Sequence, residues 1–219
     1  MRLYLSSYRT QDTAGDLLDL AGGPCRAVVI SNAVDMIPPA ERQAYARKIH
    51  DPVVELRDAG LNAEGLDLRD YFGAPAALER DLADVGLVWA VGGNAFLLCR
   101  ALRQSGLDAI LARRLAQDSL AYGGWSAGAC VAGSTLRGLH LMDEPQLVTP
   151  GYDHAVIWEG MGLVDFAIVP HFASDHPEAQ AADRAAAYMA EGAIPHRTLR
   201  DGEAILRRGD RIDVIGLPI

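Results

Sequence analysis

The segment Gly124-Trp125-Ser126-Ala127-Gly128 places one hydroxyl among small residues. An apolar run ends here and an alanine- and glycine-rich segment begins, which predicts a sharp turn from a strand into a helix. Such a turn strains the backbone of its middle residue, and small neighbours relieve the clash. The hydroxyl then stands at a helix N-terminus, where backbone N–H groups face a developing oxyanion. Ser126 is therefore a candidate nucleophile; the alternative is a glycine-rich turn whose serine caps the helix.

A serine nucleophile needs a base, because its hydroxyl is weakly reactive alone. The sequence holds six histidines, and only His171 closes an apolar run, in FAIVPHF. In a parallel sheet the carboxyl ends of strands meet at one edge, so His171 and the Ser126 turn can come together. We predict that His171 is the base.

The base in turn needs an acid that orients it. Asp143 and Glu144 lie between the serine and the histidine in the segment LMDEP, and Pro145 favours an extended loop there. Either carboxylate can serve. The alternative is a solvated acidic turn.

A second glycine-rich turn, Gly92-Gly93-Asn94, follows the apolar run LVWAV. Glycine at a strand end lets the backbone approach a ligand closely. We expect the N–H at Gly93 to join that of Ala127 in an oxyanion hole. Asn94 is a candidate substrate contact and also a candidate helix N-cap, and the two roles are compatible.

The elements that position these residues alternate between strand and helix patterns. Apolar runs predict strands over 2–8, 25–33, 61–70, 85–93, 119–126 and 166–172, and a hairpin over 203–218 that turns at 209–210. Helical spacing predicts helices over 41–60, 76–85, 94–106, 107–119 and 177–192, with a helix starting at 127. The expected fold is α/β in three layers, with a mainly parallel sheet and helices on both faces. With 219 residues, half of them hydrophobic, the expectation is one domain over 1–219.

Charge and composition limit the classes of partner that we expect this chain to bind. The net charge of −9 disfavours nucleic acid, and no apolar run is long enough to span a membrane. The start of the chain lacks the apolar core of a signal peptide, which predicts a cytoplasmic protein. Three cysteines without CxxC spacing indicate reduced buried thiols, and Cys130 is expected to pack in the core. The expected partner is a small peptide, bound by a monomer or homodimer.

These stretches together resemble peptidase family S51, which includes aspartyl dipeptidases and cyanophycinases. VGGNAFLLCRAL, GGWSAGACVAGSTLR, the DEP turn and IVPHF carry the resemblance, and the length is closer to the dipeptidase branch. The resemblance implies a fold like that of class I glutamine amidotransferases, Ser126 as nucleophile and His171 as base. It points to Asp143 as the acid, with Glu144 beside it. It implies cleavage of dipeptides with an N-terminal aspartate, with no metal or other cofactor.

The sequence departs from this family after the histidine. The dipeptidases hold the aspartyl side chain with an arginine in that segment. Here the segment is shorter, and Arg184 is its one arginine. Arg184 is the candidate for binding the substrate carboxylate; the alternative is a solvated helix charge.

Three other functions remain open on sequence alone. One is a binding module of amidotransferase-like fold without catalysis. Another is the same serine chemistry on a different small substrate. The third is a metal hydrolase that uses His171, Asp175, His176 and Glu178, whose residue types suit zinc but lack a helical H-x-x-x-H pair.

Overall fold

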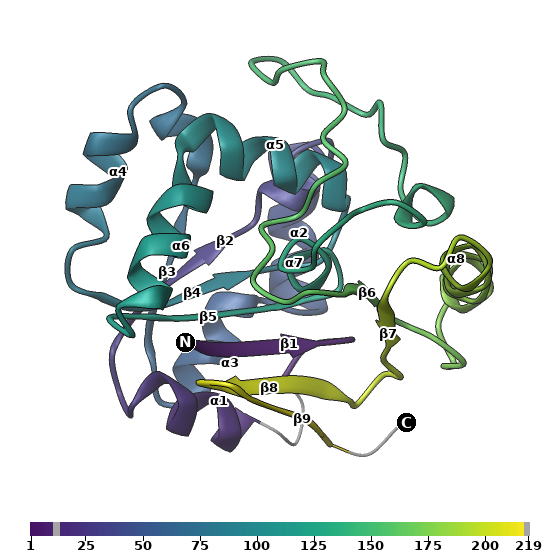
Figure 1. Ribbon diagram of the computed structural model, residues 1–219. Helices are drawn as coiled ribbons and strands as arrows, with labels where there is room; N and C mark the ends of the chain where they lie inside the picture. Colours follow the sequence, from purple (N-terminus) through teal and green to yellow (C-terminus); the bar gives the residue numbers. More distant parts are fainter. Residues whose placement is uncertain (11–13, 217–219) are drawn as a thin grey trace.

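The computed structural model describes residues 1–10 and 14–216. Within them a seven-stranded sheet has the order β3-β2-β4-β5-β1-β8-β9, and β6 pairs with β7 in a second sheet (Figure 1). The strands are β1 (Arg2–Ser6), β2 (Arg26–Ile30), β3 (Asn62–Leu66), β4 (Val85–Ala90), β5 (Ala121–Trp125), β6 (Ala167–Val169), β7 (His196–Thr198), β8 (Ala204–Arg208) and β9 (Arg211–Ile215). The pairs from β3 to β1 are parallel, whereas β8 and β9 add an antiparallel hairpin.

Helices cover both faces of the large sheet. They are α1 (Ala14–Ala21), α2 (Pro39–Lys48), α3 (Pro52–Asp58), α4 (Pro75–Asp81), α5 (Ala95–Ser105), α6 (Leu107–Ala116), α7 (Ala127–Cys130) and α8 (Ala179–Glu191). In Figure 1, α4, α5, α6 and α7 lie above the sheet and α1 and α3 below it. Along β4, Val88 packs in the core under the first group and Trp89 in the core over the second. Both faces of β4 are therefore buried, and the predicted three-layer α/β fold is confirmed.

The predicted strand around FAIVPHF forms, but not in the large sheet. Residues Ala167–Val169 make β6, which pairs in parallel only with β7 within the described chain. The expectation that His171 ends a strand of the main sheet is therefore wrong. The β6–β7 unit still packs beside α7, since Cys130 Sγ lies 3.4 Å from the carbonyl of Ile168.

The single helix predicted over 41–60 is two helices, α2 and α3. The break falls at Pro52, which has no N–H for a helix interior but suits a first helical position. Asp51 caps α3 by accepting hydrogen bonds from the amides of Val53 and Val54. The predicted C-terminal hairpin is confirmed, with the turn at Gly209-Asp210; Leu217 and Pro218 lie outside the described residues.

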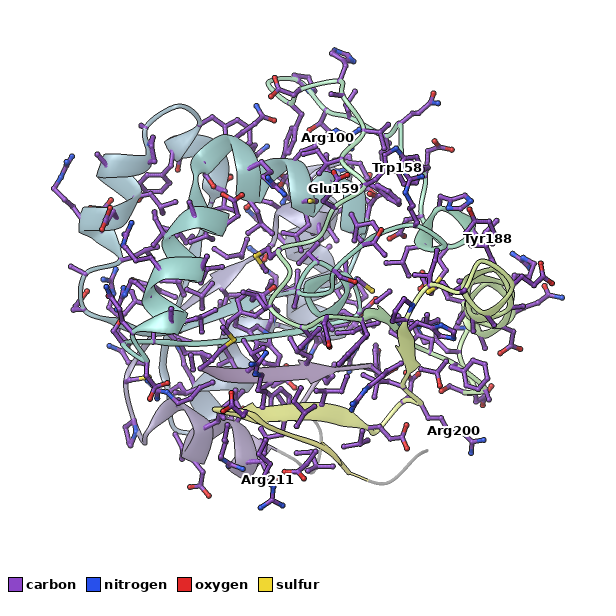
Figure 2. The ribbon with its side chains drawn as sticks, viewed as in Figure 1. Arg100, Trp158, Glu159, Tyr188, Arg200 and Arg211 are labelled. Atoms are coloured by element: carbon purple, nitrogen blue, oxygen red, sulfur yellow. The ribbon has the colours of Figure 1, made fainter. Side chains whose placement is uncertain are left out.

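A long segment crosses α5 and carries the DEP turn. Arg100 of α5 is fully buried beneath it and donates to the carbonyls of Ala155 and Pro145, at 3.0 and 2.7 Å (Figure 2). This buried guanidinium ties residues 145 and 155 to the same helix, and so positions the neighbouring Asp143.

None of the helices in the described ranges has the length and apolar character needed to cross a bilayer. All three cysteines are free; Cys99 and Cys130 are buried and Cys25 is half-buried. Burial raises the pKa of the Cys130 thiol, which fits the predicted packing role.

Candidate active site

Ser126 occupies a strained turn between β5 and α7. Its backbone angles are φ 50° and ψ −116°, outside the ordinary regions for a residue with a Cβ. A Cβ on Gly124 or Gly128 would lie 2.6 or 2.1 Å from the carbonyl oxygen of Ala90, so both positions require glycine. The Ser126 hydroxyl makes no helix cap. The small residues therefore serve the turn, and the alternative of a capping serine does not match the structure.

Two backbone amides in the glycine-rich turns have no acceptor among the described residues. Neither the amide of Gly93 nor that of Ala127 donates a hydrogen bond to any described residue. Gly93 has φ 136°, and a Cβ there would lie 2.5 Å from the carbonyl oxygen of Ala33. The amide of Ser126 itself is occupied, since it lies 3.1 Å from the carbonyls of both Ser6 and Ser7. The role of Gly93 and Ala127 as an oxyanion pair stays a prediction.

His171 pairs with an acid that the sequence analysis did not name. Its ring is buried, with a side-chain exposure of 1%, and its Nδ1 lies 2.8 Å from Oδ1 of Asp201. Burial raises the pKa of Asp201, but hydrogen bonds from His171 and Ser7 outweigh it and hold the pKa below its ordinary value. An ionised carboxylate only accepts, so Nδ1 carries the proton and Nε2 is left as the basic nitrogen.

The predicted acids lie elsewhere. Asp143 accepts a hydrogen bond at 2.8 Å from the amide of Ala95, and exposed Glu144 accepts one from the amide of Gln146. Burial raises the pKa of Asp143 to about 7, although the Ala95 amide favours its charged form. Asp143 is close enough to feel the charge of His171 but makes no hydrogen bond to its ring.

Ser7 holds the serine and histidine segments together. Its carbonyl accepts from the amide of Ser126, and its hydroxyl oxygen accepts from the amide of His171 at 2.7 Å. The same hydroxyl donates to Asp201 Oδ1 at 2.7 Å. Within the described chain no hydrogen bond joins the Ser126 hydroxyl to the His171 ring, although Ser7 ties both residues to the C-terminal end of β1. Sequence spacing gave no signal for this residue, because its role depends on three distant segments meeting.

Both polar ends of the Asn94 side chain make hydrogen bonds within the fold. Its Oδ1 caps α5 by accepting from the amide of Leu97, and its Nδ2 donates to the carbonyl of Glu144. The predicted N-cap is confirmed. Both ends of the amide are engaged, so Asn94 positions the turn that contains Asp143.

Arg184 lies on an exposed position of α8 and pairs with no described residue. A different arginine packs on an aromatic ring that contacts the histidine. The guanidinium of Arg9 lies 4.6 Å from the centre of the Tyr8 ring. That ring also contacts the rings of Trp125 and His171, at 5.5 and 6.1 Å between centroids.

His171 also stacks on His176, with ring centroids 3.8 Å apart and planes 7° from parallel. Of the four residues weighed for a metal hydrolase, His171, His176 and Glu178 come together, with ligand atoms within 4.8 Å of one another. Asp175 does not join them in the described residues.

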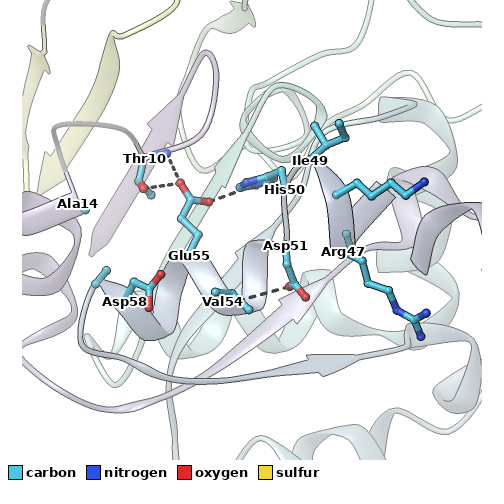
Figure 3. Close-up of a pocket in the computed structure, with 12 residues that line it drawn as sticks. Thr10, Ala14, Arg47, Ile49, His50, Asp51, Val54, Glu55 and Asp58 are labelled. Carbon is cyan, nitrogen blue, oxygen red and sulfur yellow. Dashed lines mark hydrogen bonds and ion pairs between the residues drawn. The ribbon is translucent and has the colours of Figure 1, made fainter. Parts of the chain in front are cut away.

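A cavity of about 770 Å³ is lined by residues of α2, α3 and the loops beside them (Figure 3). Its lining includes His50 and Glu55, and the Glu55 carboxylate accepts hydrogen bonds from both the amide and the hydroxyl of Thr10. None of the predicted site residues lines it. His50 contacts the ring of Trp125, at 6.3 Å between centroids, so the cavity is a neighbour of the candidate site and not part of it.

Comparison with known proteins finds peptidases that are similar to this chain. The sequence profile of Peptidase family S51 matches residues 16–215. A Peptidase E from Streptomyces coelicolor is 31% identical over 172 residues, with 76% of this chain and 67% of that protein covered. A Drosophila melanogaster protein named Probable alpha-aspartyl dipeptidase is 29% identical over 183 residues, covering 78% of this chain and 70% of its own length.

Solved structures support the fold. A Listeria monocytogenes EGD-e protein provisionally assigned to Peptidase E superposes with a TM-score of 0.77, at 20% identity, over 99% of this chain and 98% of its own. A peptidase from an acI-B1 Actinobacterium superposes with a TM-score of 0.68, at 17% identity, over 98% and 87%. The profile match spans most of the chain, and on that ground the chain belongs to peptidase family S51.

Proposed function

We propose that this chain is a serine peptidase that hydrolyses small peptides through Ser126, His171 and Asp201. The observation that carries the proposal is the pairing of the buried His171 ring with Asp201, on the same Ser7 that binds the strained Ser126 turn. Nδ1 is held by a carboxylate and Nε2 is free to accept a proton. That is the arrangement a general base for serine requires.

The reaction follows from these positions. His171 Nε2 takes the proton of the Ser126 hydroxyl as the oxygen attacks the peptide carbonyl. The amides of Gly93 and Ala127 donate to the oxyanion, and His171 then protonates the leaving amine. Water then attacks the acyl group, and His171 takes a proton from this water and gives it to the Ser126 oxygen as the acid is released. Contacts between a nucleophile and its base often tighten only in the substrate complex, which accounts for the missing hydroxyl–imidazole bond.

Asp201 takes the place that the sequence analysis assigned to Asp143 or Glu144. It is a positioning residue, because it acts on substrate only through the imidazole. Its carboxylate holds the proton on Nδ1 and stabilises the imidazolium that forms during attack.

The proposed substrates are dipeptides with an N-terminal aspartate. The first support is family membership, with relatives named Peptidase E and alpha-aspartyl dipeptidase. The second is a positively charged side chain, that of Arg9. Arg9 lies one aromatic ring away from His171, and its buried Nε has no hydrogen-bond partner among the described residues. We propose Arg9, in preference to Arg184, as the group that attracts the aspartyl carboxylate.

Hydrolysis of Asp-X, Glu-X, Asn-X and Ala-X dipeptides tests the proposal. Ser126→Ala should lower kcat by up to about 10⁶-fold on any cleaved peptide. Asp201→Asn should lower it by about 10⁴-fold, and Asp143→Asn by less. Arg9→Gln should reduce the preference for Asp-X over Ala-X, while the matched variant Arg184→Gln should leave it unchanged.

Two outcomes would overturn parts of this proposal. Near-full hydrolysis by Ser126→Ala would remove the serine mechanism altogether. A larger loss in Asp143→Asn than in Asp201→Asn would return the orienting role to Asp143.

A further inference from the structure

A carboxylate lies near the free nitrogen of His171, and a second imidazole stacks on its ring. Glu178 Oε2 lies 3.8 Å from His171 Nε2, and the ring of His176 stacks directly on that of His171. One ligand atom from each residue falls within 4.8 Å of the others. Two imidazoles and one carboxylate are a ligand set typical of zinc.

The Asp201 contact prepares His171 for a metal as well as for a proton. Histidines that bind zinc usually donate their other ring N–H to a carboxylate, which fixes the tautomer and makes the free nitrogen more basic. Here Nδ1 lies 2.8 Å from Asp201 Oδ1, so Nε2 keeps its lone pair, 3.8 Å from Oε2 of Glu178.

The two remaining ligands can move. Zinc bonds of about 2.0–2.1 Å in a tetrahedron need ligand atoms about 3.3 Å apart, so the cluster must contract. His171 is buried, but His176 is only half-buried and the Glu178 side chain is 47% exposed. Parallel rings do not aim both lone pairs at one point, so His176 must tilt. His176 Nδ1 accepts from the amide of Glu178 at 3.2 Å, so zinc binding at either nitrogen of this ring requires that hydrogen bond to break.

We propose that His171, His176 and Glu178 form an inhibitory Zn²⁺ site. Zinc on Nε2 occupies the lone pair that must accept the proton of the Ser126 hydroxyl, so attack on the peptide stops while the ion is bound. The three ligands leave a fourth position open to water. The inhibitory role rests on the proposed peptidase function, whereas the binding site does not.

Calorimetric titration of the metal-free protein with Zn²⁺ tests the site directly. The wild-type chain should bind one ion at these residues. His176→Gln and Glu178→Gln should each weaken binding by about 10-fold or more. His154→Gln is the matched control, because His154 is an exposed histidine outside the cluster. It should bind zinc like the wild type.

Peptide hydrolysis with and without Zn²⁺ tests the consequence. Each variant is compared with itself, as the ratio of its rates with and without zinc, so a lower basal rate does not confuse the result. Zinc should inhibit the wild type and His154→Gln over the concentration range in which it binds. The ratio for His176→Gln should stay near one there.

The outcomes separate the two proposals. No saturable binding up to about 1 mM, or binding unchanged by both cluster variants, overturns the site. Zinc-stimulated hydrolysis overturns the inhibitory role and favours metal catalysis. Cluster-dependent binding by a chain that cleaves none of the peptides keeps the site and ends the peptidase proposal.

Discussion

Ser126 and His171 both have positive φ, 50° and 60°, although neither is a glycine. Such strain persists only where the surrounding structure imposes it, and it is concentrated at functional sites. At both residues the constraint is visible. Their amides donate to Ser7, and the glycines around Ser126 let its turn pack closely against the carbonyl of Ala90. The strained backbone is thus part of how each side chain reaches the site.

Asp143 is the titratable group of the site with the clearest effect on stability. Burial raises its pKa to about 7, above the ordinary value near 3.8. Between these values the folded protein holds a proton that the unfolded chain releases, so the free energy of unfolding contributed by this group falls as pH rises. Asp143→Asn keeps an oxygen for the Ala95 amide and removes the titration.

We therefore expect Asp143→Asn to have a higher free energy of unfolding than the wild type, by a larger margin at pH 8 than at pH 5. The gain over the wild type should be on the order of 1 kcal/mol, discounted for the partial exposure of the residue. Urea unfolding at the two pH values measures it. Glu144→Gln, at the exposed neighbour, is the control. If the free energy of unfolding changed by the same amount between pH 5 and pH 8 in Asp143→Asn and in the wild type, the assignment would be wrong.

At the scale of elements, the β5–α7 turn depends on how closely it approaches β4. The carbonyl of Ala90, the last residue of β4, lies against both Gly124 and Gly128. Trp125 blocks Gly92 in the same way, since a Cβ there would lie 2.4 Å from its ring. The two glycine-rich turns of the sequence are therefore one packed unit.

Gly128→Ala should break that unit. The added methyl group meets backbone, which cannot rotate away, so we expect a loss of about 1–3 kcal/mol in the free energy of unfolding and a loss of hydrolysis. Gly65→Ala is the matched control, because its Cβ would meet nothing within 4 Å. Urea unfolding of both variants measures the effect. A stability of Gly128→Ala equal to that of Gly65→Ala would show that the turn tolerates a side chain.

At the scale of the whole molecule, the site is assembled from segments that are far apart in the chain. The hydroxyl of Ser7 bridges His171 and Asp201, while its carbonyl binds the Ser126 turn. The β6–β7 unit brings His171 and Asp201 to this point, with α8 between the two strands in sequence.

Ser7→Ala tests this assembly. It leaves the buried amide of His171 without its acceptor and removes one donor from Asp201, which should cost about 1–3 kcal/mol of stability. A shifted imidazole should also lower kcat by up to about 10²-fold. Ser105→Ala removes another buried hydroxyl, on α5, and should leave kcat unchanged. Steady-state kinetics on an Asp-X dipeptide distinguishes the two, and an unchanged kcat in Ser7→Ala would contradict the bridging role.

Local chemistry allowed the sequence alone to predict the three-layer α/β fold, the glycine-rich elbow at Ser126 and the Asn94 cap, and the family it indicated is the one that matches. These features depend on residues close together in the chain, where periodicity and steric size act directly. The contact between His171 and its carboxylate partner does not depend on residues close together in the chain. Asp201 follows His171 by 30 residues, beyond α8 and β7, and Asp143 has equally suitable chemistry. Only the pairing of β6 with β7 and the hydrogen bonds of Ser7 decided that the carboxylate in contact with His171 is that of Asp201 and not that of Asp143.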